Sequence, residues 1–96
     1  MTDAIRGRFG RLDVLVNNAG IGLSGPVTDM ALADWRRMSA VNVDGTFLGV
    51  KHALPLMREA RADGSRGGSI VNVSSIAGIK PSANASGYSA TKGAVR

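Results

Sequence analysis

Two side chains near the end of the chain, Tyr88 and Lys92, have types and a spacing that suit proton transfer. They lie four residues apart in the run Gly-Tyr-Ser-Ala-Thr-Lys-Gly. On a helix they would share one side, one turn apart, where the ammonium stabilises the ionised phenol and makes it a stronger acid. A serine, Ser75, precedes the tyrosine by thirteen residues. These three side chains are the core of a candidate acid–base site.

The positive charge of Lys92 alone does not bring Tyr88 into the neutral range. A free tyrosine ionises near pH ~10, so acid–base work near pH ~7 needs about 4 kcal/mol of help to the phenolate. One charge at about 6 Å, with an effective dielectric constant of about 20, supplies about 2.8 kcal/mol. A second cation would make up the difference, and an oxidised nicotinamide ring would also accept a hydride.

Three further motifs decide whether this pair is more than a solvated lysine beside a half-buried ring. The run Asn-Asn-Ala-Gly at 17–20 closes one strand-like segment, Asn42 lies in Val-Asn-Val-Asp-Gly, and the serines Ser74 and Ser75 end a second strand-like segment. In type and order these motifs resemble the short-chain dehydrogenase/reductase family. The resemblance covers residues 12–96, nearly the whole chain.

The resemblance implies a catalytic tetrad of Asn42, Ser75, Tyr88 and Lys92. Tyr88 would exchange a proton with the substrate oxygen, and Ser75 would orient and polarise that oxygen. Lys92 would make Tyr88 more acidic and bind the nicotinamide ribose, while Asn42 would help to hold a water that links Lys92 to solvent. Hydride would pass directly between the substrate carbon and the nicotinamide.

The same resemblance implies which residues contact the cofactor, NAD or NADP. They are Asn18, Ala19 and Gly20, on the adenosine side, together with Tyr88 and Lys92. Alternatively, Asn18, Ala19 and Gly20 form a turn that needs the backbone freedom of glycine. Such a turn is compatible with cofactor contact.

Each remaining site assignment has a structural alternative. Ser75 could be a strand-end serine that satisfies loop amides, although its spacing from Tyr88 favours catalysis. We expect its neighbour Ser74 to be structural. Asn42 could be an ordinary helix-interior asparagine, which lowers helix propensity; that cost favours a role for its polar groups.

The predicted fold class is α/β, part of a doubly wound, parallel-sheet (Rossmann-like) domain. The segments 12–17 and 69–74 are rich in branched apolar residues, as in parallel strands covered by helices. By the resemblance, residues 1–96 are the central segment of a single domain, without its N-terminal dinucleotide-binding βαβ unit and C-terminal strands. Two such strands form a marginal sheet, so we expect the isolated polypeptide to be poorly soluble or unfolded. Because the Gly-rich pyrophosphate loop of the family is not among these residues, we also expect the isolated polypeptide to lack NAD(H) and NADP(H) affinity.

A mostly helical stretch should connect the two strands. Within it, Gly45 and Gly49 would allow close approach of another backbone or the cofactor side, and Pro55 should bend the helix. We expect Thr28 or Asp29 to serve as the N-terminal cap. One apolar face is predicted from three- and four-residue steps. Its members are Trp35, Met38, Val41, Leu48, His52, Leu56 and Met57.

Two loops and a last helix complete the predicted elements. Residues 61–68 read as a surface turn, and residues 79–86 as a loop that in the family borders the substrate. The last helix should start near Ser86. His52, the only histidine, reads as a packed core residue rather than a ligand, and no metal site is visible.

Composition sets the remaining bounds. Twelve basic and seven acidic residues give a net charge of +5, but the basic residues are scattered, which argues against nucleic acid as a partner. There is no cysteine, no signal-like segment and no apolar run of membrane-spanning length. We therefore expect a cytoplasmic protein that contacts no membrane.

The predicted function is that of an NAD(P)-dependent oxidoreductase acting on CH–OH groups, with a small alcohol or ketone as substrate. The isolated 96 residues are expected to be inactive. Two alternatives stay open: a non-catalytic scaffold of the same fold, and a basic nucleic-acid-binding module. By analogy with the family the parent protein would be a homodimer or homotetramer. The sequence does not identify the substrate or distinguish NAD from NADP.

Overall fold

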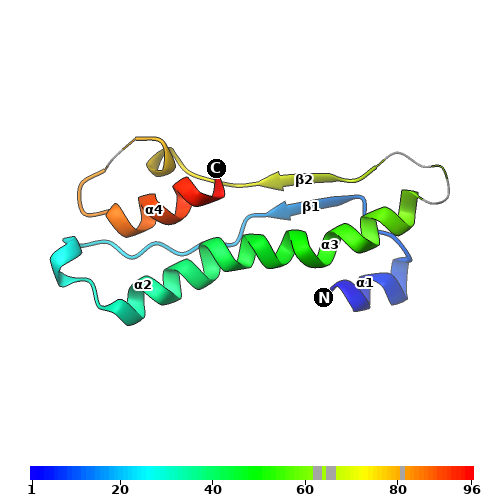
Figure 1. Cartoon of the computed structure of the whole chain (residues 1–96), viewed down its shortest axis with the longest axis horizontal. Coiled ribbons are helices and arrows are strands. Elements are labelled where there is room, and N and C mark those ends of the chain that lie inside the picture. The colour runs from blue at the N-terminus through cyan, green and yellow to red at the C-terminus, as the bar shows by residue number, and fades with distance from the viewer. Residues whose placement is uncertain (62–63, 65–66, 81) are drawn as a thin grey trace.

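The computed structural model describes residues 1–61, 64, 67–80 and 82–96. The predicted turn at 61–68 lies partly outside this range. Figure 1 shows an elongated, flat arrangement in which two strands run beside one long helical rod. In chain order the elements are α1 (Thr2–Phe9), β1 (Val14–Asn17), η1 (Val27–Asp29), α2 (Leu32–Ser39), η2 (Ala40–Asp44), α3 (Gly45–Arg61), β2 (Ser69–Asn72), η3 (Ile76–Gly78) and α4 (Ser86–Val95).

The two strands pair in parallel, which confirms the predicted class of sheet. Val14 lies opposite Ser69, and the register continues to Asn17 opposite Asn72. At that last pair the side chains also meet, because Asn17 Nδ2 donates to Asn72 Oδ1 at 2.9 Å. The strands are shorter than the apolar segments that predicted them.

Helix α3 covers one face of the sheet, and α1 lies against α3 (Figure 1). A bidentate ion pair between Arg6 and Glu59, with both N–O distances at 3.1 Å, joins the two helices. Gly49 allows α3 to approach β1, since a Cβ at this position would collide with the Asn17 side chain. Gly45 has no such neighbour: a Cβ there would lie 3.7 Å from the Ala40 carbonyl oxygen, an ordinary contact.

The opposite face of the sheet carries exposed apolar side chains. Valines at alternate strand positions point to the same side of paired strands, and they remain between 37% and 56% exposed. They are Val14, Val16, Val71 and Val73. The described residues therefore cover one face of the sheet, whereas the predicted fold class has helices on both.

The apolar core is small and lies along α2 and α3. Among the described residues the buried apolar side chains are Met38, Ala53, Leu56, Met57 and Val95. The predicted apolar face is thus only partly buried, because Trp35 and Leu48 are 39% and 44% exposed.

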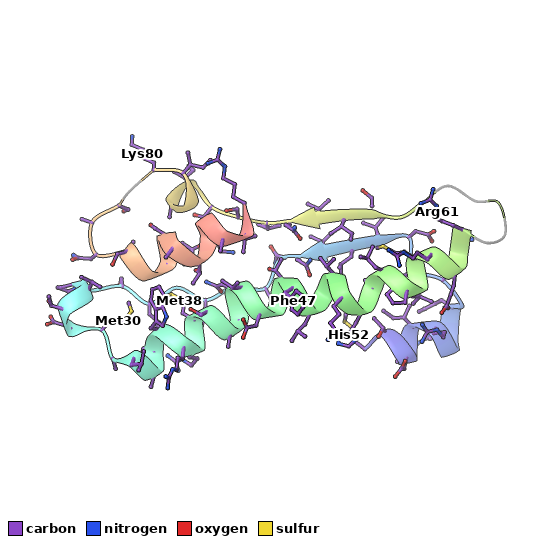
Figure 2. All side chains as sticks on the ribbon, viewed as in Figure 1. Met30, Met38, Phe47, His52, Arg61 and Lys80 are labelled. Atoms are coloured by element: carbon purple, nitrogen blue, oxygen red, sulfur yellow. The ribbon has the colours of Figure 1, made fainter. Side chains whose placement is uncertain are left out.

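The prediction of a packed core histidine is wrong. His52 is exposed on the side of α3 that faces α1, where it lines a cavity (Figure 2). A three- and four-residue periodicity marks the side of a helix but does not say whether another element covers it. Here the described residues leave a cavity beside His52, so its side chain stays exposed.

Two local features of the helical rod differ from expectation. Helix α2 begins after Ala31, which makes no side-chain cap, so the proposed caps Thr28 and Asp29 are wrong; both lie in the separate 3-10 turn η1. The rod also contains a π-helical turn, η2, between α2 and α3. Pro55 lies within α3, which continues through it.

No helix among the described residues has the length and apolar character to cross a bilayer.

Candidate active site

Tyr88 and Lys92 lie on one side of α4, as their spacing predicts. The ammonium nitrogen of Lys92 lies 5.9 Å from the centroid of the Tyr88 ring. Lys92 is buried, 4% exposed, and its Nζ donates to the Val73 carbonyl at 3.1 Å. Within the described part of the chain no carboxylate lies within ion-pair distance of Lys92. The ammonium therefore lies over the Tyr88 ring without a neutralising carboxylate among the described residues.

Helix α4 is fixed by close packing at both ends. Near its start Gly87 lies against the Met38 and Met30 side chains, so that a Cβ there would come within 2.7 Å of Met38 Cε. Gly78 in η3 packs on the helix backbone, and a Cβ there would lie 2.8 Å from the Lys92 carbonyl. At Gly78 the neighbours are backbone atoms that leave no room for a side chain, so glycine sets the approach of η3 to the helix there; at Gly87 the neighbours are the flexible ends of two methionine side chains.

The predicted division between the two serines agrees with the contacts of Ser74. Its hydroxyl donates to the Lys92 carbonyl at 2.6 Å, which is a structural role. Ser75 ends the segment that follows β2 and precedes η3, and its Oγ accepts the amide of Ala77 at 3.2 Å. This is the loop contact named above as the alternative role for Ser75. It uses a lone pair of the oxygen and leaves the hydroxyl proton available to another acceptor.

The loop after β1 passes over Tyr88 and Lys92 at two glycines. A Cβ at Gly20 would lie 3.0 Å from Lys92 Nζ and 3.4 Å from Asn42 Oδ1. A Cβ at Gly22 would lie 3.6 Å from the Tyr88 ring. The segment that begins with the Asn-Asn-Ala-Gly motif therefore forms one wall of the site.

Asn42 joins this loop to α4 from the π-helical turn. It is fully buried, its Oδ1 accepts the Ile21 amide at 2.8 Å, and its Nδ2 donates to the Ile21 carbonyl and to Thr91 Oγ1, both at 2.9 Å. π-Helical turns are rare in proteins, and those that do occur often lie at functional sites. Here the turn lies where the asparagine must reach two other segments.

Comparison with known proteins assigns the chain to a family. Residues 1–96 match the short chain dehydrogenase family over their whole length. The chain belongs to that family. It is 48% identical over 89 residues, 93% of this chain and 32% of the relative, to the trans-4-hydroxycyclohexanecarboxylate dehydrogenase of Sinomonas cyclohexanicum.

Solved structures of short chain dehydrogenases share the fold. ElxO with NADP bound superposes with a TM-score of 0.86 at 42% identity, over 97% of this chain and 36% of that chain. A gluconate 5-dehydrogenase from Burkholderia cenocepacia, in complex with NADP and tartrate, gives a TM-score of 0.83 at 35% identity, over 98% of this chain and 35% of its own. The chain thus spans about a third of the length of the relatives it matches.

The residues expected to hold the dinucleotide cofactor of a short chain dehydrogenase fit it in two respects. Asn18 and Ala19 line an open cavity of about 540 Å³ between β1, α3 and the start of α1. Lys92 Nζ, which can donate three hydrogen bonds, uses one on Val73, and Gly20 leaves the space beside it free of a side chain. Tyr88 does not line this cavity.

Thr91, Ile21 and Gly22, which make contacts within the candidate site, were not among the residues singled out from the sequence. Thr91 directly precedes the motif lysine, but a threonine on a helix gives no signal of its own without knowledge of what it faces. In the described part of the chain no cluster of three metal-ligating side chains occurs.

Proposed function

We propose that these 96 residues are the central, catalytic segment of a single Rossmann-like domain in an NAD(P)-dependent oxidoreductase. The reaction is hydride transfer between the nicotinamide and an alcohol or ketone, with Tyr88 as general acid and base. The observation that carries this proposal is the buried Lys92 ammonium, which lies 5.9 Å from the Tyr88 ring centroid and has no carboxylate partner among the residues that the structure describes. Family membership and the NADP-bound relatives support it.

In the oxidising direction the alcohol loses a proton and a hydride. A bound oxidised nicotinamide supplies the hydride acceptor and a second positive charge. The ionised phenol of Tyr88 takes the hydroxyl proton, and Lys92 stabilises the phenolate before that transfer. The hydroxyl of Ser75 donates to the substrate oxygen and fixes its orientation. The product is the ketone, and reduction runs through the same positions in reverse.

In this proposal Asn42 supports the reaction by holding neighbouring segments in place. Its side-chain hydrogen bonds go to Ile21 and Thr91, and its carbonyl accepts the Thr46 hydroxyl at 3.0 Å. With these groups engaged, Asn42 holds the loop after β1 against α4. A water held near Lys92, which the family resemblance implies, would lie beside this network.

The proposal can be tested by transplanting the segment. In a chimera, these 96 residues replace the matching third of the Sinomonas cyclohexanicum dehydrogenase, which contributes its own remaining segments. We expect the chimera to fold, bind cofactor and oxidise the host's substrate with a kcat within about tenfold of the host, a factor that corresponds to about 1.4 kcal/mol in the barrier.

The control is the same chimera with Ser75→Ala, which we expect to lose most of its turnover while it keeps cofactor binding. A chimera that folds and binds cofactor but turns over no substrate would contradict the proposal. That result would favour the alternative of a non-catalytic scaffold with the same fold.

A further inference from the structure

Thr91 closes a hydrogen-bonded circuit around Tyr88 and Lys92. Its side chain is buried, 3% exposed, and its Oγ1 donates to the Tyr88 carbonyl at 2.9 Å. The same oxygen accepts from Asn42 Nδ2 at 2.9 Å. We infer that Thr91 is a positioning residue: through the Asn42 amide, its hydroxyl fixes the loop at residues 20–22 against the phenol and the ammonium. The inference rests on the proposed function.

The direction of the hydrogen bonds explains why a hydroxyl is needed at Thr91. A threonine hydroxyl has one proton to donate. Since that proton goes to the Tyr88 carbonyl, the oxygen can only accept from Asn42, so Asn42 must present its NH₂ group to Thr91. The amide oxygen of Asn42 is then left to accept the Ile21 amide. A flipped amide would place two acceptors against each other at Thr91 and two donors against each other at Ile21.

The far end of the circuit returns to the acid–base pair. Ile21, held by Asn42 through both its amide and its carbonyl, lies between two glycines that contact the pair. A Cβ at Gly20 would approach Lys92 Nζ to 3.0 Å, and one at Gly22 would approach the Tyr88 ring to 3.6 Å. A change in the Asn42 orientation therefore moves the wall of the site against the reacting groups.

Other contacts hold α4 in place without Thr91. Gly87 packs against Met38, and Ser74 donates to the Lys92 carbonyl at 2.6 Å. Loss of the Thr91 hydroxyl should therefore leave α4 in place. The buried Nδ2 of Asn42 would lose one of its acceptors, and a buried donor without an acceptor is unfavourable in free energy. This separates positioning from simple stabilisation of the helix.

The test uses two variants of the chimera described above, measured with the unvaried chimera. Thr91→Val keeps the shape of threonine and removes the hydroxyl; Thr91→Ser keeps the hydroxyl and removes the methyl group. We expect Thr91→Val to lower kcat roughly tenfold or more, because small misplacements of reacting groups are costly. The cofactor Kd should rise several-fold and the KM for the alcohol should change little. Thr91→Ser should recover most of both losses.

Unchanged kcat and cofactor Kd in Thr91→Val, with only a lower Tm, would overturn the inference and leave Thr91 a structural residue. Equal losses in Thr91→Ser and Thr91→Val would also overturn it, because the hydroxyl would then not be the cause. If Thr91→Val does not fold, Thr91→Ala is measured in the same way and decides by the same criteria. If the unvaried chimera binds cofactor without turnover, the proposed function fails, and the cofactor Kd of the variants still decides the role of Thr91.

Discussion

The hydroxyl of Ser74 lies 2.6 Å from the carbonyl oxygen of Lys92, so the serine beside the candidate catalytic Ser75 is bonded to the backbone of the helix that carries the acid–base pair. Adjacent residues of one type thus have different contacts, since Ser75 Oγ accepts the amide of Ala77 at the start of η3. Substitution can separate their roles.

We predict that Ser74→Ala lowers stability and Ser75→Ala lowers activity. Loss of the bond from Ser74 to Lys92 should cost about 1 kcal/mol of unfolding free energy, a typical value for one hydrogen bond. Thermal unfolding and turnover are measured for both variants in the chimera, and each variant serves as the control for the other. Equal loss of turnover in Ser74→Ala and Ser75→Ala would contradict the assignment.

A second prediction concerns the contact between η3 and α4. An alanine at Gly78 would bring its Cβ to 2.8 Å from the Lys92 carbonyl carbon and oxygen, both backbone atoms that cannot turn aside. We expect Gly78→Ala to destabilise the chimera by about 2 kcal/mol, as overpacking does. The matched control is Gly93→Ala on the facing helix, where the new Cβ would lie at an ordinary 3.6 Å from the Gly78 carbonyl. Equal Tm values for the two variants would show that the packing is looser than described.

Much of this arrangement could be predicted from the sequence because its signals are local. Branched apolar runs predicted two parallel strands, and a four-residue spacing placed Tyr88 and Lys92 on one side of a helix that begins at Ser86. The roles of the tetrad remain proposals.

Other features could not be predicted because they depend on what packs against a residue. The π-helical turn at 40–44 has no propensity signal, yet it lies where Asn42 reaches Ile21 and Thr91. The helical periodicity predicted an apolar side that included His52, but not that this residue would be exposed. A cap at Thr28 or Asp29 was a plausible choice by residue type, yet the chain starts α2 after Ala31.

The third prediction is a pH dependence at the start of β1. Arg11 lies beside Asp13, with Nη2 2.7 Å from Oδ1, and this hydrogen bond holds the pKa of Asp13 below its ordinary value of 3.8. A carboxyl whose pKa is lower in the folded state stabilises the fold above that ordinary value. The contribution is lost as the pH falls through the folded-state pKa.

The Asp13→Asn variant of the chimera should therefore lose less stability than the unvaried chimera on acidification below pH 3.8. Above that pH the unfolding free energies of the two proteins should differ by a constant amount. Urea unfolding at a series of pH values measures both ranges. Parallel curves throughout would show that the ion pair makes no difference to folding.

The fourth prediction concerns these 96 residues on their own. Their radius of gyration is 16.3 Å, whereas a compact domain of 100 residues has about 13 Å. Only five apolar side chains in the described part of the chain are buried. We expect no cooperative thermal transition from the isolated polypeptide and no saturable quenching of Trp35 fluorescence by NAD(H) or NADP(H). A sharp transition on heating would contradict the first expectation, and saturable quenching the second.

The central claim is that the phenol of Tyr88 moves the proton, and the Tyr88→Phe variant of the chimera tests it most directly. The substitution removes one oxygen and leaves the ring that packs against Gly22. We predict that kcat falls by about 10²-fold or more, the range of general acid–base catalysis, while the cofactor Kd and the Tm stay close to those of the unvaried chimera. A Tyr88→Phe chimera that turns over substrate at the unvaried rate would contradict the account.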